Sequence, residues 1–148
     1  MFILSGLAFA SLLIAAAVTD IRGTRIPNSI TGALVLVFIV SCAFGLHRPL
    51  APHLIAFAMA FVFGAALFFG RLWGGGDAKL LAAIGLYLEP RQVLALLLVT
   101  ALAGGVLAAG LLVRRATAGS NIQHDNTIPY GVALAFGGLA VGLKGFLP

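Results

Sequence analysis

Two aspartates, Asp20 and Asp77, have the residue type and the sequence context that catalysis would need. The sequence contains four acidic residues, of which Glu89 and Asp125 stand in polar loops. Asp20 and Asp77 instead stand at the ends of apolar segments, where a carboxylate is costly and indicates a functional site. Two carboxylates brought close together share one proton, because both cannot ionise easily. Such a pair can hydrolyse a peptide bond: one member takes a proton from water while the other protonates the carbonyl oxygen.

Each aspartate also has a structural interpretation that the sequence leaves open. An aspartate at the end of an apolar segment can cap a helix or stand in a solvated loop. Asp77 occupies an expected helix N-terminus, where the positive end of the helix dipole favours an acid. The pair is more informative than either member, because the segments between the two residues predict that both reach the same membrane face.

Three consecutive glycines, Gly74, Gly75 and Gly76, precede Asp77. Glycine lets another backbone approach closely, so an extended substrate strand is expected to lie against this segment. Glycine is also abundant where membrane helices pack against one another, which is the structural alternative. Lys79 stands two residues past Asp77 and cannot share its helical face. We therefore expect Lys79 to reach toward the membrane interface rather than to pair with Asp77.

The remaining polar residues predict no other catalytic or metal site. His47 and His53 fall on the membrane face opposite the two aspartates, and His124 stands in a polar loop, so no Ser-His-Asp arrangement is expected. The two aspartates and His124 supply too few ligands for a metal site. Cys42 has no second cysteine to pair with and is expected to be a packing residue. We predict that the chain uses no metal ion and no cofactor.

The composition of the elements that position the aspartates indicates a membrane protein. Of the 148 residues, 61% are hydrophobic and 9% are charged, and the mean hydropathy is +1.14. Soluble domains are about 45–50% apolar and about 25% charged, and a chain of this size could not bury so much apolar surface. This composition excludes a soluble enzyme, a disordered protein and a nucleic-acid-binding domain. The net charge of +5 is spread thinly, as in loops that face anionic lipid headgroups rather than nucleic acid.

The pattern of apolar runs predicts a single all-α integral membrane domain over residues 1–148, with about six transmembrane helices. The fourth run has nine residues and would cover about 14 Å, half of the hydrocarbon core of the bilayer. It therefore starts deeper in the membrane or is re-entrant, which leaves a five-span topology as an alternative. The glycine-rich segment before it is expected to line a hydrated cleft. The predicted runs are Phe2–Thr19, Ser29–Leu46, Leu54–Gly70, Leu80–Leu88, Val93–Val113 and Ile128–Leu147.

The positions of the basic residues predict the orientation. Two complete runs separate Asp20 from Asp77, so the chain crosses the membrane and returns between them. The side that holds both aspartates carries six basic residues and the other side carries three, which predicts that the aspartates face the cytoplasm. The polar segment 116–126 lies on the same side and is expected to be a solvated connector, with a mobile flap as the alternative. The two groups are Arg22, Arg25, Arg71, Lys79, Arg114 and Arg115, against Arg48, Arg91 and Lys144.

Three motifs in this order resemble the prepilin peptidases, intramembrane aspartic proteases of the GxGD type. The segment Gly74–Gly85 is similar to the GxGDxK signature of that family and to the leucines and glycine that follow it. The segment Thr19–Asn28 is similar to the aspartate, basic residue and Ile-Pro-Asn of the family's other motif. The segment Ile128–Ala133 resembles the sequence that opens the family's last span. The resemblance covers approximately residues 10–140.

The resemblance implies that Asp20 and Asp77 are the catalytic pair of an endopeptidase in the bacterial inner membrane. Such enzymes remove the basic leader of prepilins or pseudopilins at the cytoplasmic face. The chain begins directly at its first apolar run and lacks the paired cysteines of the larger, bifunctional members. It is thus similar to the short peptidases of Tad (Flp) pilus systems, and no methyltransferase activity is expected. The motif positions expected to bind substrate or shape the site are Gly74, Gly76, Lys79 and Arg22.

Other functions remain compatible with the same residues. A small proton or ion carrier could use Asp20 and Asp77 as intramembrane proton sites. Carriers place such acids near the membrane midplane, whereas these two stand near one face. A non-catalytic assembly scaffold and an archaeal-type preflagellin peptidase are the further alternatives. The sequence does not indicate the oligomeric state or the particular substrate.

Overall fold

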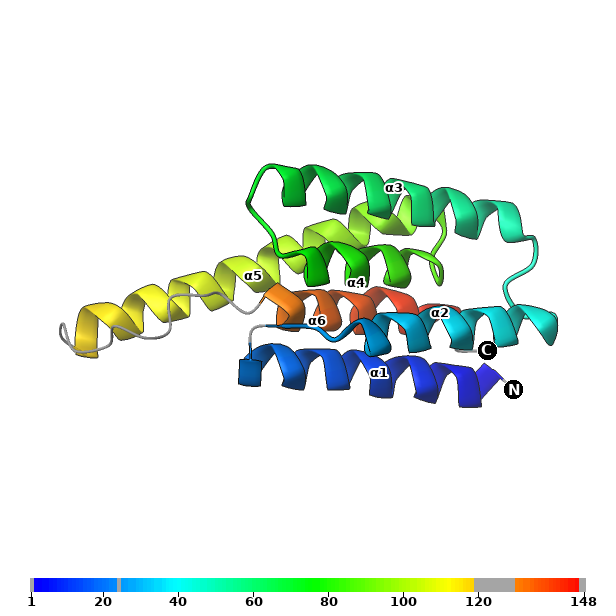
Figure 1. The fold of residues 1–148 in the computed structure, drawn as a ribbon, viewed down its shortest axis with the longest axis horizontal. Coiled ribbons are helices and arrows are strands. Elements are labelled where there is room, and N and C mark those ends of the chain that lie inside the picture. Colours follow the sequence, from blue (N-terminus) through cyan, green and yellow to red (C-terminus); the bar gives the residue numbers. More distant parts are fainter. Residues whose placement is uncertain (1, 24, 119–129, 147–148) are drawn as a thin grey trace.

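A computed structural model of the protein describes residues 2–23, 25–118 and 130–146. Within these ranges every regular element is a helix, as the sequence predicts for an all-α protein (Figure 1). Six α-helices are followed by a short 3₁₀ helix. They are α1 (Phe2–Gly23), α2 (Asn28–Ala43), α3 (Leu50–Phe69), α4 (Gly75–Gly85), α5 (Pro90–Ala118), α6 (Tyr130–Gly142) and η1 (Leu143–Phe146).

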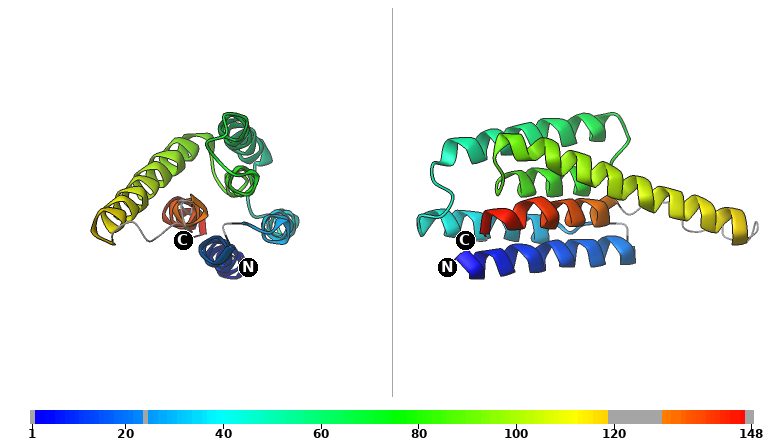
Figure 2. Two further views of the ribbon diagram at one scale, coloured as in Figure 1. Left: turned by 60° about the vertical axis from the view of Figure 1, so that its left-hand side comes forward. Right: turned by 180° about the vertical axis from the view of Figure 1, so that it is seen from behind.

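Successive helices run in alternating directions along one bundle axis (Figure 1). As a result α1 and α3 end, and α2, α4 and α6 begin, at the same end of the bundle, which we call the aspartate end. Helix α5 also runs toward this end and extends beyond the other helices, as the view from behind shows (Figure 2). The chain thus crosses and returns between Asp20 and Asp77, as the alternation of apolar runs predicts.

Three helices, α1, α3 and residues 90–114 of α5, are long and apolar enough to cross a membrane, and α2 and α6 are shorter apolar helices. Large apolar side chains cover the outside of the bundle, with Ile3 at 75% exposure and Phe69 at 81%. Exposure on this scale is unfavourable in water and suits contact with lipid chains. The protein is an all-α, multi-pass membrane protein.

Helix α4 is short and lies inside the bundle. Its 11 residues extend about 16 Å, and in Figure 1 it stops short of the far ends of α2 and α3. It begins at Gly75, five residues before the predicted run 80–88, because the first turn is capped by Asp77. The turn that leads into α5 is buried at Leu86, Tyr87 and Leu88, and the Tyr87 hydroxyl donates a hydrogen bond to the carbonyl of Leu34.

Several other boundaries differ from the sequence prediction. Helix α1 continues past Asp20 to Gly23, so Asp20 lies inside its last turn rather than after it. Helix α5 continues to Ala118, five residues past the predicted end and three residues into the predicted connector 116–126. No glycine or proline interrupts the chain between Gly110 and Gly119, and arginine and alanine favour helix there. The rest of that connector, including Ser120 and His124, lies outside the described residues.

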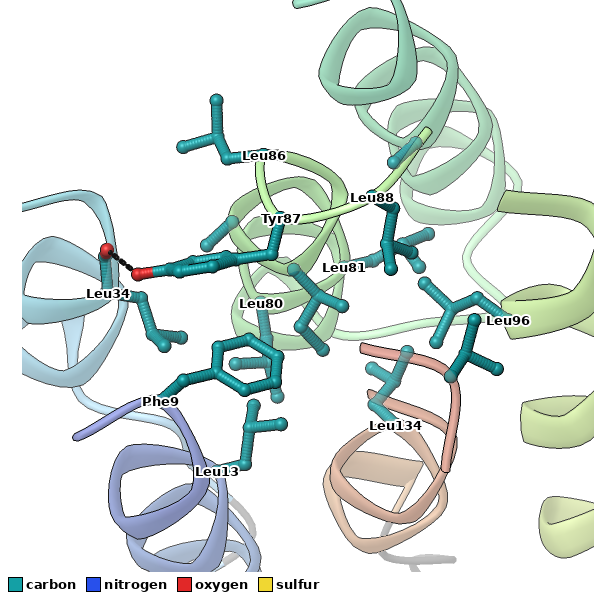
Figure 3. Packing of buried hydrophobic residues seen from close by; sticks show 14 of the residues in the cluster. Phe9, Leu13, Leu34, Leu80, Leu81, Leu86, Tyr87, Leu88, Leu96 and Leu134 are labelled. Carbon is teal, nitrogen blue, oxygen red and sulfur yellow. Dashed lines mark hydrogen bonds between the residues drawn. The ribbon is translucent and has the colours of Figure 1, made fainter. Parts of the chain in front are cut away.

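The core consists of apolar side chains from all six α-helices, which pack around those of α4 and the turn after it (Figure 3). Helix α6 lies between α1, α4 and α5 (Figure 2). Two of its glycines allow this close fit: a Cβ on Gly137 would lie 2.5 Å from Thr100 Oγ1, and one on Gly138 would lie 2.8 Å from Leu13 Cδ1. Small residues permit such close packing of membrane helices. The same packing brings the N-terminus of α6 to the end of α1.

Candidate active site

Asp20 and Asp77 line one pocket at the aspartate end of the bundle. The pocket measures about 280 Å³ and lies between the last turn of α1, the segment that leads into α2 and the first turn of α4. Its lining is largely polar, whereas the hollows between α1 and α2 and between α5 and α6 are lined mainly by apolar side chains. The full lining of the aspartate pocket is Asp20, Arg25, Ile26, Gly74, Gly75, Gly76 and Asp77.

The carboxylate of Asp20 is buried and is held by the backbone of α6. Its side chain is 5% exposed, and its Oδ2 accepts a hydrogen bond of 2.8 Å from the N–H of Gly131, 111 residues away in sequence. The backbone N–H of Val132 also interacts with it. Free N–H groups and the helix dipole make a helix N-terminus favourable for an anion. A Cβ on Gly131 would lie 2.8 Å from Asp20 Cγ, so this contact requires glycine.

Asp77 lies in the first turn of α4 and caps the start of its own helix. Its Oδ2 accepts a hydrogen bond of 3.2 Å from the N–H of Gly74. Burial raises the pKa of the Asp77 carboxyl, the negative charge of Asp20 raises it further, and the Gly74 N–H partly opposes both, so that the pKa is about 6. The two carboxylates therefore interact, and Asp77 holds a proton more readily than an ordinary aspartate.

The glycines before Asp77 allow close contacts within the protein. A Cβ on Gly76 would lie 3.2 Å from the Cβ of Ile26, and one on Gly74 would lie 3.2 Å from Asp77 Oδ2. Gly76 thus lets the segment before α2 pack against the first turn of α4, and Gly74 gives Asp77 room to cap the helix. Space for a substrate strand along these glycines stays a prediction.

Two of the residues expected to shape the site lie outside the pocket lining. Lys79 donates a hydrogen bond of 3.0 Å from its Nζ to Asn28 Oδ1, which joins α4 to the first residue of α2. Lys79 and Asn28 line a different hollow, between α2, α3 and α4. Arg22 is exposed in the last turn of α1. The arginine that lines the pocket is Arg25, three residues further along the chain.

Sequence reasoning did not assign Arg25, Ile26 and Gly131 to the site. Gly131 belongs to a motif that the sequence shows, but no local pattern indicates that its N–H reaches Asp20. A further contact at the aspartate end joins α4 to α6: the rings of Trp73, just before α4, and Tyr130, at the start of α6, have centroids 5.8 Å apart. The segment before α4 and the N-terminus of α6 are therefore packed together.

The arrangement can perform general acid–base chemistry on a substrate that enters the pocket. One carboxylate is held by backbone donors, and the other keeps a proton up to about pH 6 because of burial and its neighbour's charge. That combination is the one that a two-aspartate hydrolysis of an amide requires. Within the described ranges, no three His, Cys, Asp or Glu side chains gather closely enough to hold a metal ion.

Comparison with known proteins places the chain in a family. The sequence model of the type IV leader peptidase family matches residues 7–109, which include both aspartates. A prepilin leader peptidase/N-methyltransferase from Xanthomonas campestris pv. campestris is 28% identical over 150 residues, which cover 91% of this chain and 48% of that protein. The chain thus spans about half the length of this curated relative. No solved structure matches it. The chain belongs to the type IV leader peptidase family.

Proposed function

We propose that this protein is a membrane aspartic endopeptidase that removes the leader peptide from prepilin or pseudopilin precursors. Asp20 and Asp77 are its catalytic pair. The observation that carries the proposal is that both aspartates line one polar pocket in a chain of the type IV leader peptidase family. The match to a prepilin leader peptidase supports the class of substrate.

In this mechanism the two carboxylates share one proton and activate a water molecule between them. The ionised member takes a proton from the water, whose oxygen forms a bond to the scissile carbonyl carbon. The other member gives its proton to the carbonyl oxygen, which yields an uncharged tetrahedral intermediate. The intermediate collapses when a proton passes to the amide nitrogen and the C–N bond breaks. Water is the only co-reactant.

The proposal extends to the inner membrane, with the pocket at the cytoplasmic face. Six basic residues flank the aspartate end in the sequence, against three at the other end, and basic residues are enriched in cytoplasmic loops. A pocket at the cytoplasmic face suits a precursor whose leader is cytoplasmic and whose following segment lies in the bilayer. Precursors of Tad (Flp) pilins are the first candidate substrates in this proposal.

Co-expression with a candidate prepilin tests the proposal, with removal of the leader read as a shift on a gel. The wild-type chain is expected to shorten the prepilin. Asp20→Asn and Asp77→Asn are each expected to reduce cleavage by about 100-fold or more, because neither carboxylate can do both proton transfers. Glu89→Gln is the control, since Glu89, just before α5, pairs with the exposed Arg91 in the first turn of that helix. Substantial processing by either asparagine variant would contradict the two-aspartate mechanism.

A proton carrier that uses the same two aspartates is the alternative from another functional class. Carriers place such groups near the membrane midplane, whereas the pocket is lined by residues at the end of α1 and the start of α4, which lie at one end of the bundle (Figure 1). Reconstitution into vesicles with a pH-sensitive dye separates the two functions, because the peptidase is expected to carry no proton flux.

A further inference from the structure

The two aspartates differ in what surrounds their carboxylates. Asp20 is 5% exposed and accepts the Gly131 N–H at 2.8 Å, with the Val132 N–H beside it, at the N-terminus of another helix. Among the described residues, the hydrogen bond to Asp77 is longer, at 3.2 Å, and comes from the N–H of Gly74, the residue just before its own helix. Backbone donors favour the ionised form of a carboxyl group.

We propose that the N-terminus of α6 makes Asp20 the ionised member of the pair, and that Gly131 is the positioning residue that holds it. Asp77 is then the member that carries the shared proton. This assignment rests on the proposed peptidase function. It goes beyond the family match, which ends at residue 109 and does not include α6.

The other ionisable groups at the pocket do not account for the difference. Arg25 lines the same pocket as both carboxylates, so its place in the lining does not distinguish one from the other. Tyr130 stands at the start of α6, where its ring packs against Trp73. The asymmetry therefore comes from α6, whose dipole and N–H groups act on Asp20. The raised pKa of Asp77, about 6, agrees with its role as the proton carrier.

The assignment gives each proton transfer a named donor and acceptor. Asp20 takes a proton from water as the water oxygen bonds to the carbonyl carbon, and Asp77 gives its proton to the carbonyl oxygen. In the second step, when the tetrahedral intermediate collapses, the proton on Asp20 passes to the amide nitrogen as the C–N bond breaks. Asp77 recovers a proton from the hydroxyl group as the new carboxylic acid forms. Both aspartates end in their starting states.

Chemical modification of the wild-type protein tests the assignment without any substrate. Dicyclohexylcarbodiimide is apolar and reacts with protonated carboxylic acids. After treatment of the detergent-solubilised protein at pH 5 to 8, mass spectrometry locates the adduct. We expect Asp77 to be modified at least about fivefold faster than Asp20, at a rate that falls as the pH rises through about 6. Equal or faster modification of Asp20, or no modification of Asp77 at pH 5, would overturn the assignment.

A pair of glycine variants in α6 tests the positioning role of Gly131. In Gly131→Ala the added Cβ would lie 2.8 Å from Asp20 Cγ, so the carboxylate must leave its N–H donor. In Gly138→Ala, on the same helix, the added Cβ would lie at the same 2.8 Å distance, but from Leu13 in the apolar core. The second variant crowds α6 equally and leaves the carboxylate in place.

We expect Gly131→Ala to move the acidic limb of the kcat/KM profile up by about one pH unit, because the ionised Asp20 loses a donor. Gly138→Ala is expected to lower the thermal stability and to leave that limb where it is. The same profile in both variants would show that the α6 contact is only structural. Failure of the proposed peptidase function would instead appear as no cleavage by the wild type, while the modification pattern would still report which aspartate is protonated.

Discussion

A carboxylate as buried as Asp20 persists in an apolar bundle because backbone donors reach it. An unpaired charge away from water costs many kcal/mol, and a buried carboxyl group without partners would become neutral instead. At Asp20 the compensation comes from one glycine N–H and the end of one helix. The contact that stabilises the Asp20 carboxylate therefore comes from the backbone of Gly131. Asp20→Asn tests the role of the carboxylate in the reaction, but it does not test this contact.

The pH dependence of cleavage is expected to report Asp77. Burial and the charge of Asp20 hold the pKa of Asp77 at about 6, so the proton that the acid must donate is lost as the pH rises through that value. We expect kcat/KM for a leader peptide to fall above about pH 6, by about tenfold for each further pH unit. A Glu89→Gln control should keep the same profile, and a flat profile from pH 5 to 8 would show that Asp77 is not the acid.

His47 is expected to make the fold less stable in acid. It lies in the turn between α2 and α3 with its Nε2 buried and without a hydrogen-bond partner among the described residues. Burial, helped by the nearby His53, lowers the pKa of His47 to about 4. Below about pH 6.5, His47 therefore becomes protonated in the unfolded chain but stays neutral in the folded chain. The free energy of unfolding decreases as a result while the pH falls toward 4.

The variant that tests this is His47→Asn, because asparagine tolerates the positive φ of 58° found at this position. Thermal unfolding in detergent at pH 7.5 and pH 5 should show a smaller acid-induced decrease in Tm for the variant than for the wild type. An equal decrease in both proteins would mean that other groups cause the acid sensitivity.

At the scale of elements, the first turn of α4 depends on the segment before α2. Gly76→Val is expected to reduce cleavage about tenfold, because the side chain would meet Ile26 and push Arg25 and Asp77 apart. Overpacking of this kind costs about 1–3 kcal/mol. Gly105→Val, at an exposed glycine with nothing within 4 Å, is the matched control. Equal activities of the two variants at equal protein levels would show that the contact is unimportant.

A second substitution separates internal packing from space for a substrate. If Gly76→Val acts by crowding Ile26, then adding Ile26→Ala should restore part of the activity, because the smaller side chain frees room in the protein. If the valine instead blocks a substrate strand, the double variant should remain as impaired as Gly76→Val alone. Leader cleavage at matched expression levels distinguishes these outcomes.

The hydrogen bond between Lys79 and Asn28 is expected to fasten α4 to α2. Lys79→Met and Asn28→Ala should each lower the free energy of unfolding by less than about 1 kcal/mol, because the bond is exposed. Their effects should not add in the double variant, since both changes remove the same bond. A change in KM caused by Lys79→Met in the Asn28→Ala background would show instead that Lys79 contacts the substrate.

At the scale of the whole molecule, the alternating helices predict which loops share a membrane face. In a Cys42→Ala background, cysteines at Arg22 and Arg114 should react with an impermeant thiol reagent from one side, and a cysteine at Arg48 from the other. Intact cells and inverted vesicles provide the two sides, and the proposal assigns the first to the cytoplasm. Labelling of all three from one side would show that the topology is wrong.

Much of this architecture could be predicted from the sequence because it depends on local pattern. Apolar runs near the thickness of the bilayer predict helices, and an even number of crossings brings Asp20 and Asp77 to one end of the bundle. Helix ends were less predictable. Asp20 interrupts the apolar run but does not end α1, and α5 continues past Arg114. A charged residue can end the apolar part of a helix without ending the helix itself.

What the sequence by itself determined is the membrane class, the helical fold and the common face of the two aspartates. Composition determines whether water or lipid surrounds the chain, and the lengths of the apolar runs determine how often it crosses the bilayer. Only the tertiary structure decided which groups surround the carboxylates. Gly131 reaches Asp20 because Gly137 and Gly138 let α6 pack closely against α5 and α1. Arg25 lines the pocket, whereas Arg22 is exposed in the last turn of α1, because Arg25 belongs to the segment before α2 that packs against the first turn of α4. Such contacts depend on how distant helices fit together, and no local pattern carries that information.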